Sequence, residues 1–275
     1  MGYPAFSVAI SVYKNDVPEY LARALESITS QQTVRPKEIV LVVDGPVSNQ
    51  INRVIEEFDK TYPMFTVIRL KENQGLGNAL RLAVEQSRCG LIARMDSDDI
   101  SEPDRFEQQL RMFREHPETD IIGGDIEEFV DSEENVIACR RVPVTDGEIK
   151  QYMKKRCPLN HVSVMFRKEA VLRSGNYQDW FQNEDYYLWI RMEKAGCVMG
   201  NTGTTLVRVR VSEDMYRRRG GWKYFSSEAK LQKYMYRERM ISLPVYFVNV
   251  MKRLIVQVLL PNRLRGWVFR HFARE

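Results

Sequence analysis

The first 95 residues alternate between short apolar runs and amphipathic segments, and this alternation limits the folds that the chain can adopt. Apolar runs rich in β-branched residues predict strands at residues 6–12, 39–43, 65–70 and 91–95. Between them, apolar residues at helical spacing predict a helix that connects each strand to the next. Strands connected in this way lie parallel in one sheet, with right-handed crossovers. The sequence therefore predicts an α/β fold with a mostly parallel central sheet flanked by helices.

Two of these strands end in acidic residues. Asp44 follows the second strand, and Asp96, Asp98 and Asp99 follow the fourth. Like charges this close repel one another, and each costs free energy to bury, so a cation that offsets both effects would account for them. Parallel strands deliver such residues to one edge of the sheet, where open α/β sheets bind their ligands.

Asp96 and Asp98 stand two residues apart on an extended segment, so their side chains point to the same side. Their oxygen ligands suit Mn²⁺ or Mg²⁺, and such an ion would also hold a diphosphate. We therefore expect a divalent-metal site for a phosphorylated ligand. The alternative is a capped, solvated turn, in which Asp99 caps the turn that follows.

Beyond residue 100 the alternation is less regular. Helix starts are predicted at residues 101–104 and at Glu184, and strands at 121–124, 127–142 (with a turn at 131–135), 162–166 and 205–211. Arg81 or Arg94 could help to bind a nucleotide, but both are expected at the surface. The chain shows no internal repeat and no low-complexity linker, which favours one core domain followed by a helical tail.

Positive charge is concentrated toward the C-terminus. Residues 208–275 hold sixteen Lys and Arg but five Asp and Glu, whereas the net charge of the whole chain is only +4. This excess suggests an anionic surface or ligand, and the total charge is too small to indicate nucleic acid. Residues 243–272 interleave apolar and basic side chains. That pattern fits either a helix packed on the core or an amphipathic helix on anionic lipid.

The sequence contains no signal for export or membrane spanning. Residues 1–6 lack the basic and apolar regions of a signal peptide, and no run of about 18 uncharged apolar residues predicts a spanning helix. The four cysteines lack the spacing of a zinc site or a disulfide framework, so a reducing compartment is expected.

Six short motifs follow one another in a characteristic order and spacing. They are Tyr13-Lys14-Asn15, Val43-Asp44-Gly45, residues 73–79 (NQGLGNA), Asp96–Asp99 with Pro103 and Arg105-Phe106, Asn160-His161 before residues 164–167, and Asn183-Glu184-Asp185 before Trp189. Over roughly residues 6–225, the chain resembles the inverting nucleotide-diphospho-sugar glycosyltransferases of family 2. The resemblance is nearest in character to bacterial enzymes that build O-antigen or capsular repeat units on a lipid carrier.

The resemblance implies a GT-A fold with a Rossmann-like sheet. Residues 1–225 would form the glycosyltransferase domain, with a nucleotide-binding half at about 1–100 and an acceptor half at about 101–225. Residues 226–275 would form a basic amphipathic helical tail. The acidic cluster would be the family's DxD motif, in which Asp98 ligates the metal and Asp96 faces the ribose or the metal.

The resemblance also assigns the nucleotide side of the site. Asp44 would accept a hydrogen bond from the uracil N3–H, although Val43 replaces the first of two acids that many relatives have there. Gly75 would let the backbone approach the nucleotide closely near a helix start, and Tyr13 would line the same pocket. Arg217, Arg218 and Arg219 would pair with the pyrophosphate from a glycine-flanked lid; the alternative is a solvated basic loop.

On the acceptor side, Asp185 would be the general base, with Glu184 beside it in the first turn of a helix. A helix N-terminus lowers the pKa of such a carboxylate, and an apolar wall from Trp180 or Trp189 raises it; the sequence leaves this balance open. His161 would lie close to the metal or the acceptor, although a structural role is the more common one for a lone histidine.

Together these observations predict a metal-dependent, inverting hexosyltransferase. Its donor would be UDP-galactose or UDP-glucose, and its acceptor a saccharide on polyprenyl diphosphate, joined through a β-linkage. It would act in the cytoplasm, peripherally on the anionic inner face of the bacterial cytoplasmic membrane, and would bind no nucleic acid. The alternatives are a sugar-1-phosphate nucleotidyltransferase, which would need a glycine-rich basic loop after the first strand, and a non-catalytic scaffold at the membrane surface.

Overall fold

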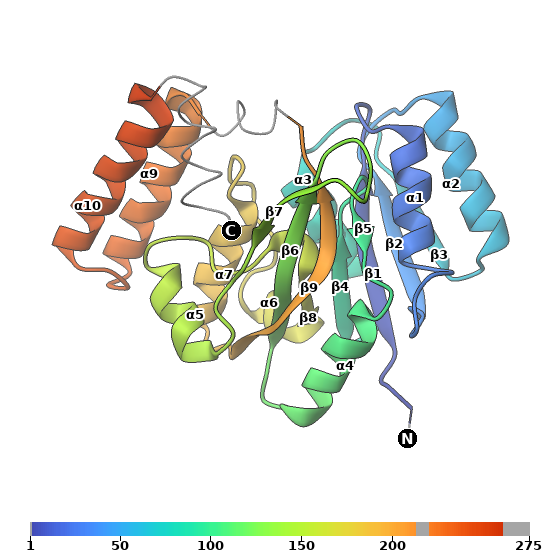
Figure 1. Ribbon diagram of the computed structural model, residues 1–275, viewed down its shortest axis with the longest axis horizontal. Coiled ribbons are helices and arrows are strands. Elements are labelled where there is room, and N and C mark those ends of the chain that lie inside the picture. Colours follow the sequence, from blue (N-terminus) through green and yellow to red (C-terminus); the bar gives the residue numbers. More distant parts are fainter. Residues whose placement is uncertain (1, 213–219, 261–275) are drawn as a thin grey trace.

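We describe a computed structural model of the chain, which covers residues 2–212 and 220–260. A single sheet runs through the molecule, and helices cover both of its faces (Figure 1). The strand order is β3-β2-β1-β4-β8-β6-β9-β5, with β7 paired to β6. The predicted lid arginines Arg217–Arg219 and the end of the tail, residues 261–275, lie outside the described residues.

The N-terminal half has the predicted alternation of strand and helix. Its elements are β1 (Phe6–Val12), α1 (Pro18–Ser27), β2 (Glu38–Val43), α2 (Asn49–Thr61), β3 (Phe65–Arg69), α3 (Leu76–Gln86) and β4 (Leu91–Met95). β2 pairs with β1 and β3, and β1 pairs with β4, all in parallel. β2 is buried along its whole length, as expected for a central parallel strand with helices on both faces.

The second half is mixed in direction. It contains β5 (Ile100–Ser101), α4 (Arg105–Glu115), β6 (Ile121–Phe129), β7 (Val136–Arg140), α5 (Asp146–Met153), the 3₁₀ turn η1 (His161–Ser163), β8 (Met165–Arg167), α6 (Lys168–Arg173), α7 (Glu184–Lys194) and β9 (Met199–Arg210). β8 runs antiparallel between β4 and β6, whereas β9 lies parallel to β6 and antiparallel to β5. The predicted α/β class is confirmed.

Two apolar cores lie on opposite faces of the sheet. α1, α2 and α4 cover one face, and residues from α3, α5, α6, α7 and α9 form the core on the other (Figure 1). β4 contributes to both cores because its side chains alternate, with Ile92 on the α7 side and Leu91, Ala93 and Met95 on the other.

Helices α9 (Trp222–Arg237) and α10 (Leu243–Leu254) form a hairpin at the edge of the molecule, and the π-helical turn η2 (Ile255–Leu259) follows (Figure 1). The inner side of the α9–α10 hairpin packs on the core, since the buried Asn249 amide donates to the Lys154 carbonyl and to Gln232 Oε1, both at 2.8 Å. Its outer side exposes an apolar stripe of Leu243, Phe247, Val248, Met251, Ile255 and Leu259. Among the described helices, none is long and apolar enough to cross a membrane.

Several predicted elements have other bounds in the structure. β9 begins at Met199, whereas a strand was expected from residue 205. Residues 161–163 form a 3₁₀ turn where a strand was expected over 162–166, and β8 begins only at Met165. The buried Ser163 side chain explains the turn, because its Oγ donates to the carbonyl oxygens of Gly124 and Asn160 and accepts from Gly124 N–H. The helix predicted from residue 101 begins at Arg105, because Ile100 and Ser101 pair with β9.

Candidate active site

The acidic turn that follows β4 is organised by a buried arginine. Arg94 is 2% exposed, and its two terminal nitrogens each donate to one oxygen of Asp96 at 2.5 Å. The expectation that Arg94 lies at the surface is therefore wrong. Two-residue spacing on an extended strand places both side chains on the same face, and a planar guanidinium matches a carboxylate in this two-point geometry.

Asp98, two residues further on, has no such partner among the described residues. The pKa of Asp98 is raised to about 6. Desolvation by the surrounding protein is the main cause, and the negative charges of Asp96 and Asp16 add to it. Asp16 Oδ2 accepts hydrogen bonds from Ser97 Oγ and from Tyr13 N–H, which brings a further acid to the turn. A carboxylate in this setting favours a cation with oxygen ligands, so the residues present fit Mn²⁺ or Mg²⁺.

The part of the chain that the structure describes does not by itself supply a complete set of metal ligands. Within residues 2–212 and 220–260, no three His, Cys, Asp or Glu side chains converge where they could hold an ion. An ion at Asp98 would therefore take its remaining ligands from a diphosphate and water, as Mg²⁺ commonly does at nucleotide sites.

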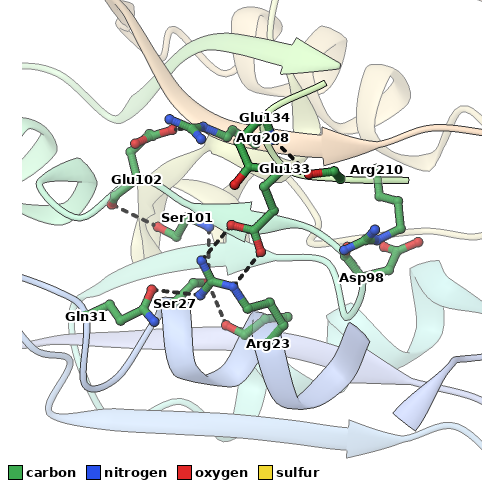
Figure 2. Close-up of polar contacts among 12 residues, drawn as sticks. Arg23, Ser27, Gln31, Asp98, Ser101, Glu102, Glu133, Glu134, Arg208 and Arg210 are labelled. Atoms are coloured by element: carbon green, nitrogen blue, oxygen red, sulfur yellow. Dashed lines mark hydrogen bonds and ion pairs between the residues drawn. The ribbon is translucent and has the colours of Figure 1, made fainter. Parts of the chain in front are cut away.

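Asp99 faces into the protein. It is 3% exposed, and its Oδ1 accepts the backbone N–H of Arg210 at 2.8 Å, which ties the turn to the end of β9. The Arg210 side chain extends beside Asp98 and donates to its carbonyl oxygen (Figure 2). The Asp99 side chain therefore binds the end of β9 rather than capping the turn that follows Asp99.

Asp44 lies at the end of β2 and organises the loop before α3. Its carboxylate accepts hydrogen bonds from Asn73 Nδ2 at 2.9 Å, Gln74 N–H at 2.7 Å and Gly75 N–H at 2.9 Å. The loop approaches so closely that a Cβ on Gly45 would meet Asn73 N at 2.7 Å. Oδ1 keeps one lone pair that can accept a further donor such as a nucleobase N–H. Whether Asp44 and Gly75 contact a nucleotide stays a prediction.

Glu184 and Asp185 begin α7, on the face of the sheet toward which Arg94 points. Burial raises the pKa of Glu184 to about 7, with the Asp185 charge as the second cause. Burial also raises the pKa of Asp185, opposed by its backbone hydrogen bond and by the charges of Arg94 and Arg140. Burial thus outweighs the helix N-terminus at both carboxyl groups, and it raises both pKa values, that of Glu184 to about 7.

Two neighbours of Asp185 were not found by sequence reasoning. The Cys157 thiol donates to Asp185 Oδ2 at 3.8 Å, and Arg140 donates to the Cys157 carbonyl at 2.7 Å. Neither residue stands in a recognisable motif. Cys157 lies between α5 and η1, and Arg140 is the last residue of β7, so only the three-dimensional arrangement connects them with the acid.

His161 lies between aromatic side chains. Its Nε2 is 2.9 Å from the hydroxyl of the buried Tyr177, and its ring meets the edge of Trp189. Burial, and then the charge of Arg94, lower its pKa well below the usual value, so His161 is neutral at pH 7. A structural role fits these contacts, and its role toward a metal or acceptor stays a prediction.

Comparison with known proteins gives a consistent result. The family model described as "Glycosyl transferase family 2" matches residues 7–181. The amylovoran biosynthesis glycosyltransferase AmsE of Erwinia amylovora is 39% identical over 82% of this chain and 84% of its own length. An Escherichia coli enzyme named UDP-Gal:alpha-D-GlcNAc-diphosphoundecaprenol beta-1,3-galactosyltransferase is 35% identical over 99% of this chain and 98% of its own length.

Solved structures share the fold. The chain superposes on S. aureus TarS residues 1–349, crystallised with UDP-GlcNAc, with a TM-score of 0.68 and 14% identity. The match covers 96% of this chain and 78% of that one. The chain spans about half (47%) of a longer TarS structure.

Proposed function

Because this chain belongs to glycosyl transferase family 2 and has its fold, we propose that it transfers a hexose from a UDP-sugar, galactose or glucose, to a saccharide on polyprenyl diphosphate. The observation that carries the proposal is the pair of acidic sites that flank Arg94: Asp96 and Asp98 on one side, Glu184 and Asp185 on the other. The named E. coli relative, aligned along nearly its full length, supports the donor and the lipid-linked acceptor.

The donor would lie along the edge formed by the ends of β2 and β4. Asp44 would accept from the base, with Gly75 and Tyr13 beside it, and Asp96 would face the ribose. The Arg217–Arg219 segment remains a candidate for the pyrophosphate. A divalent ion at Asp98 would act as a Lewis acid that neutralises charge on the departing UDP.

The transfer would be a direct displacement with inversion. The acceptor hydroxyl oxygen forms a bond to the sugar C1 while the bond from C1 to the diphosphate oxygen breaks and UDP leaves with that electron pair. Asp185 would take the hydroxyl proton, which requires it to be ionised beforehand. Its raised pKa makes it a better base than an exposed aspartate, and the nearby positive charges of Arg94 and Arg140 favour its ionised form.

The α9–α10 hairpin would place the enzyme on the inner face of the bacterial membrane, close to its lipid-linked acceptor. The apolar stripe of α10 supplies an area that can enter the headgroup region. Within residues 220–260, every charged residue that is fully exposed is basic: Lys223, Lys230, Lys233, Arg237, Arg239 and Lys252. A surface that combines an apolar stripe with mostly basic charged residues fits an anionic bilayer.

A donor and acceptor screen tests this proposal. The full chain is incubated with Mn²⁺, a synthetic polyprenyl-diphosphate saccharide and each of several nucleotide sugars, and both UDP release and the glycosylated lipid are measured. We expect one UDP-hexose to give a product with a β-linkage by NMR. An α-linked product would refute inversion, and the absence of any lipid product would refute the assigned acceptor.

A further inference from the structure

Arg94 occupies an unusual position for a charged residue. It lies on a strand that is otherwise buried and apolar, and it is almost fully enclosed, at 2% exposed. Its side chain shares the face of Ile92, where the core includes Trp189 from α7 and the buried Tyr177. A buried guanidinium costs free energy unless it is paired, so its partners explain why it is there.

The first partner is on the donor side. The bidentate bond to Asp96 uses both oxygens of that carboxylate and fixes the plane in which their remaining lone pairs point. It also sets one positive charge against the carboxylates of a turn that holds Asp96, Asp98 and, through Ser97, Asp16.

The second group of partners is on the acceptor side. The positive charge of Arg94 lowers the pKa values of Glu184 and Asp185 against the larger effect of their burial. Charged and titratable groups that also face these two carboxyl groups are Arg140, Cys157, Tyr177, Tyr186 and Asp96. The charge of Arg94 thus acts on both pairs of acids.

A second buried arginine shows that burial alone does not produce this arrangement. Arg105 is fully buried beneath the same turn, yet it donates only to neutral groups, namely Gln109 Oε1, Met95 Sδ and the carbonyl oxygens of Arg94 and Val164. Arg94 differs because its guanidinium directly contacts the Asp96 carboxylate, and because its charge also acts on Glu184 and Asp185.

We propose that Arg94 is a positioning residue that serves both halves of the reaction: it orients Asp96 toward the sugar nucleotide and supplies the positive charge that keeps Glu184 and Asp185 ready to take a proton. The inference rests on the proposed function, since it assigns the two acid pairs to donor and acceptor. The proposal predicts that Arg94 affects donor binding through Asp96. Its effect on Glu184 and Asp185, and so on proton transfer from the acceptor, should not depend on Asp96.

A double-mutant cycle separates the two effects. Arg94→Gln, Asp96→Asn and the combined variant are compared by the Kd of UDP with Mn²⁺, measured by calorimetry, and by kcat at saturating donor. In the wild-type background, Arg94→Gln should weaken UDP binding about tenfold and lower kcat about 100-fold. In the Asp96→Asn background it should leave the Kd within about twofold, yet still lower kcat about tenfold.

Two further variants guard against a purely structural effect. Arg191→Gln removes another buried arginine, one that donates to the carbonyl oxygens of Ser174 and Asn176, and it should lower the Tm without changing Kd or kcat. Arg94→Lys keeps the charge but loses the two-point contact. If Arg94→Gln does not fold, Arg94→Lys should weaken UDP binding in the wild-type background and retain kcat in the Asp96→Asn background.

The outcomes are distinct. An unchanged kcat on adding Arg94→Gln to Asp96→Asn would overturn the acceptor effect, and a further loss of UDP affinity there would overturn the route through Asp96. A wild-type chain that transfers no sugar would refute the proposed function. The Kd comparison needs no acceptor and would still decide whether Arg94 acts on the donor through Asp96.

Discussion

The carboxylate of Asp44 accepts the backbone N–H of Gly75 at 2.9 Å, although the two residues are 31 positions apart. This contact holds Gly75 at a φ of 87°, in the left-handed region, at the residue that precedes α3. The acid that the sequence assigned to a nucleobase therefore also shapes the loop that would lie against the nucleotide.

Replacing Asp44 should affect stability and binding together. Asp44→Ala removes the carboxylate that accepts from the N–H groups of Gln74 and Gly75, and each such hydrogen bond to a charged group contributes about 1.5–3 kcal/mol. We expect a lower free energy of unfolding in urea and weaker UDP binding by calorimetry. The exposed Asp59→Ala on α2 serves as the control. Equal stability of the two variants would refute the role of Asp44 in the loop.

Replacing Asp185 should separate chemistry from donor binding. Asp185→Asn keeps the shape of the side chain but cannot take the acceptor proton, so kcat should fall by about 10²–10⁴-fold. The Kd of UDP should not change, because the proposed role of Asp185 is toward the acceptor and not toward the nucleotide. Glu193→Gln, further along α7, is the matched control. If Asp185→Asn turns over at the wild-type rate, the base is another residue.

The pH dependence of stability should reveal Glu184. Its raised pKa, about 7, means that the folded protein holds a proton that the unfolded chain releases above about pH 4.5. The contribution to stability is therefore greatest at low pH and is lost as the pH rises through 7. Urea unfolding from pH 5 to 8 should show a smaller decline for Glu184→Gln than for wild type.

The exposed Glu57→Gln on α2 is the control for this measurement, and its decline should match that of wild type. Asp98 and Asp185, whose pKa values are also raised, add a decline of the same sign that Glu184→Gln leaves in place. Parallel curves for Glu184→Gln and wild type would show that Glu184 titrates in the ordinary range.

Chelation should stop sugar transfer reversibly. Treatment with EDTA should abolish product formation, and added Mn²⁺ should restore it, because a Lewis acid contributes several kcal/mol of charge stabilisation at the leaving group. Asp98→Asn should lower activity by about 100-fold or more and remove the effect of Mn²⁺ on UDP affinity. The exposed Asp104→Asn should behave as wild type. Full activity in EDTA would refute the metal.

The apolar stripe of α10 should bind anionic vesicles. Phe247→Asp with Met251→Asp places charge where the side chains are 58% and 50% exposed, so the fold should tolerate both changes. Co-sedimentation with phosphatidylglycerol-containing vesicles should fall sharply, and UDP binding should remain. Leu172→Asp alters an exposed apolar residue on α6 and is the control. Equal vesicle binding by all variants would exclude α10 as the contact.

The parallel half of the fold follows directly from sequence, because each of its strands is a run of apolar residues without competing signals. The acid cluster was also evident, since carboxylates at strand ends are conspicuous. Arg94 was expected at the surface because a lone arginine usually lies there. The available signal was its two-residue spacing from Asp96 on a strand, which places both on one face.

Other parts of the site depend on contacts that sequence does not encode locally. The turn at residues 161–163 is stabilised by Ser163 bonding to Gly124, almost 40 positions away, so a β-rich run there gave the wrong element. The pKa of Asp185 likewise depends on Arg140 and on the burial created by the packing around α7. Such effects arise from tertiary packing and override local propensity.

The strand order also has a consequence for how the enzyme is made. On one side of the acidic turn, β4 pairs with β1, which has already been synthesised; on the other, Ile100 pairs with Arg208, about a hundred residues later. A growing chain can assemble β1–β4, but Asp99 gains its contact with Arg210 only when β9 emerges. A chain truncated before β9 would therefore keep the parallel strands β1–β4 and lack the contact that holds Asp99.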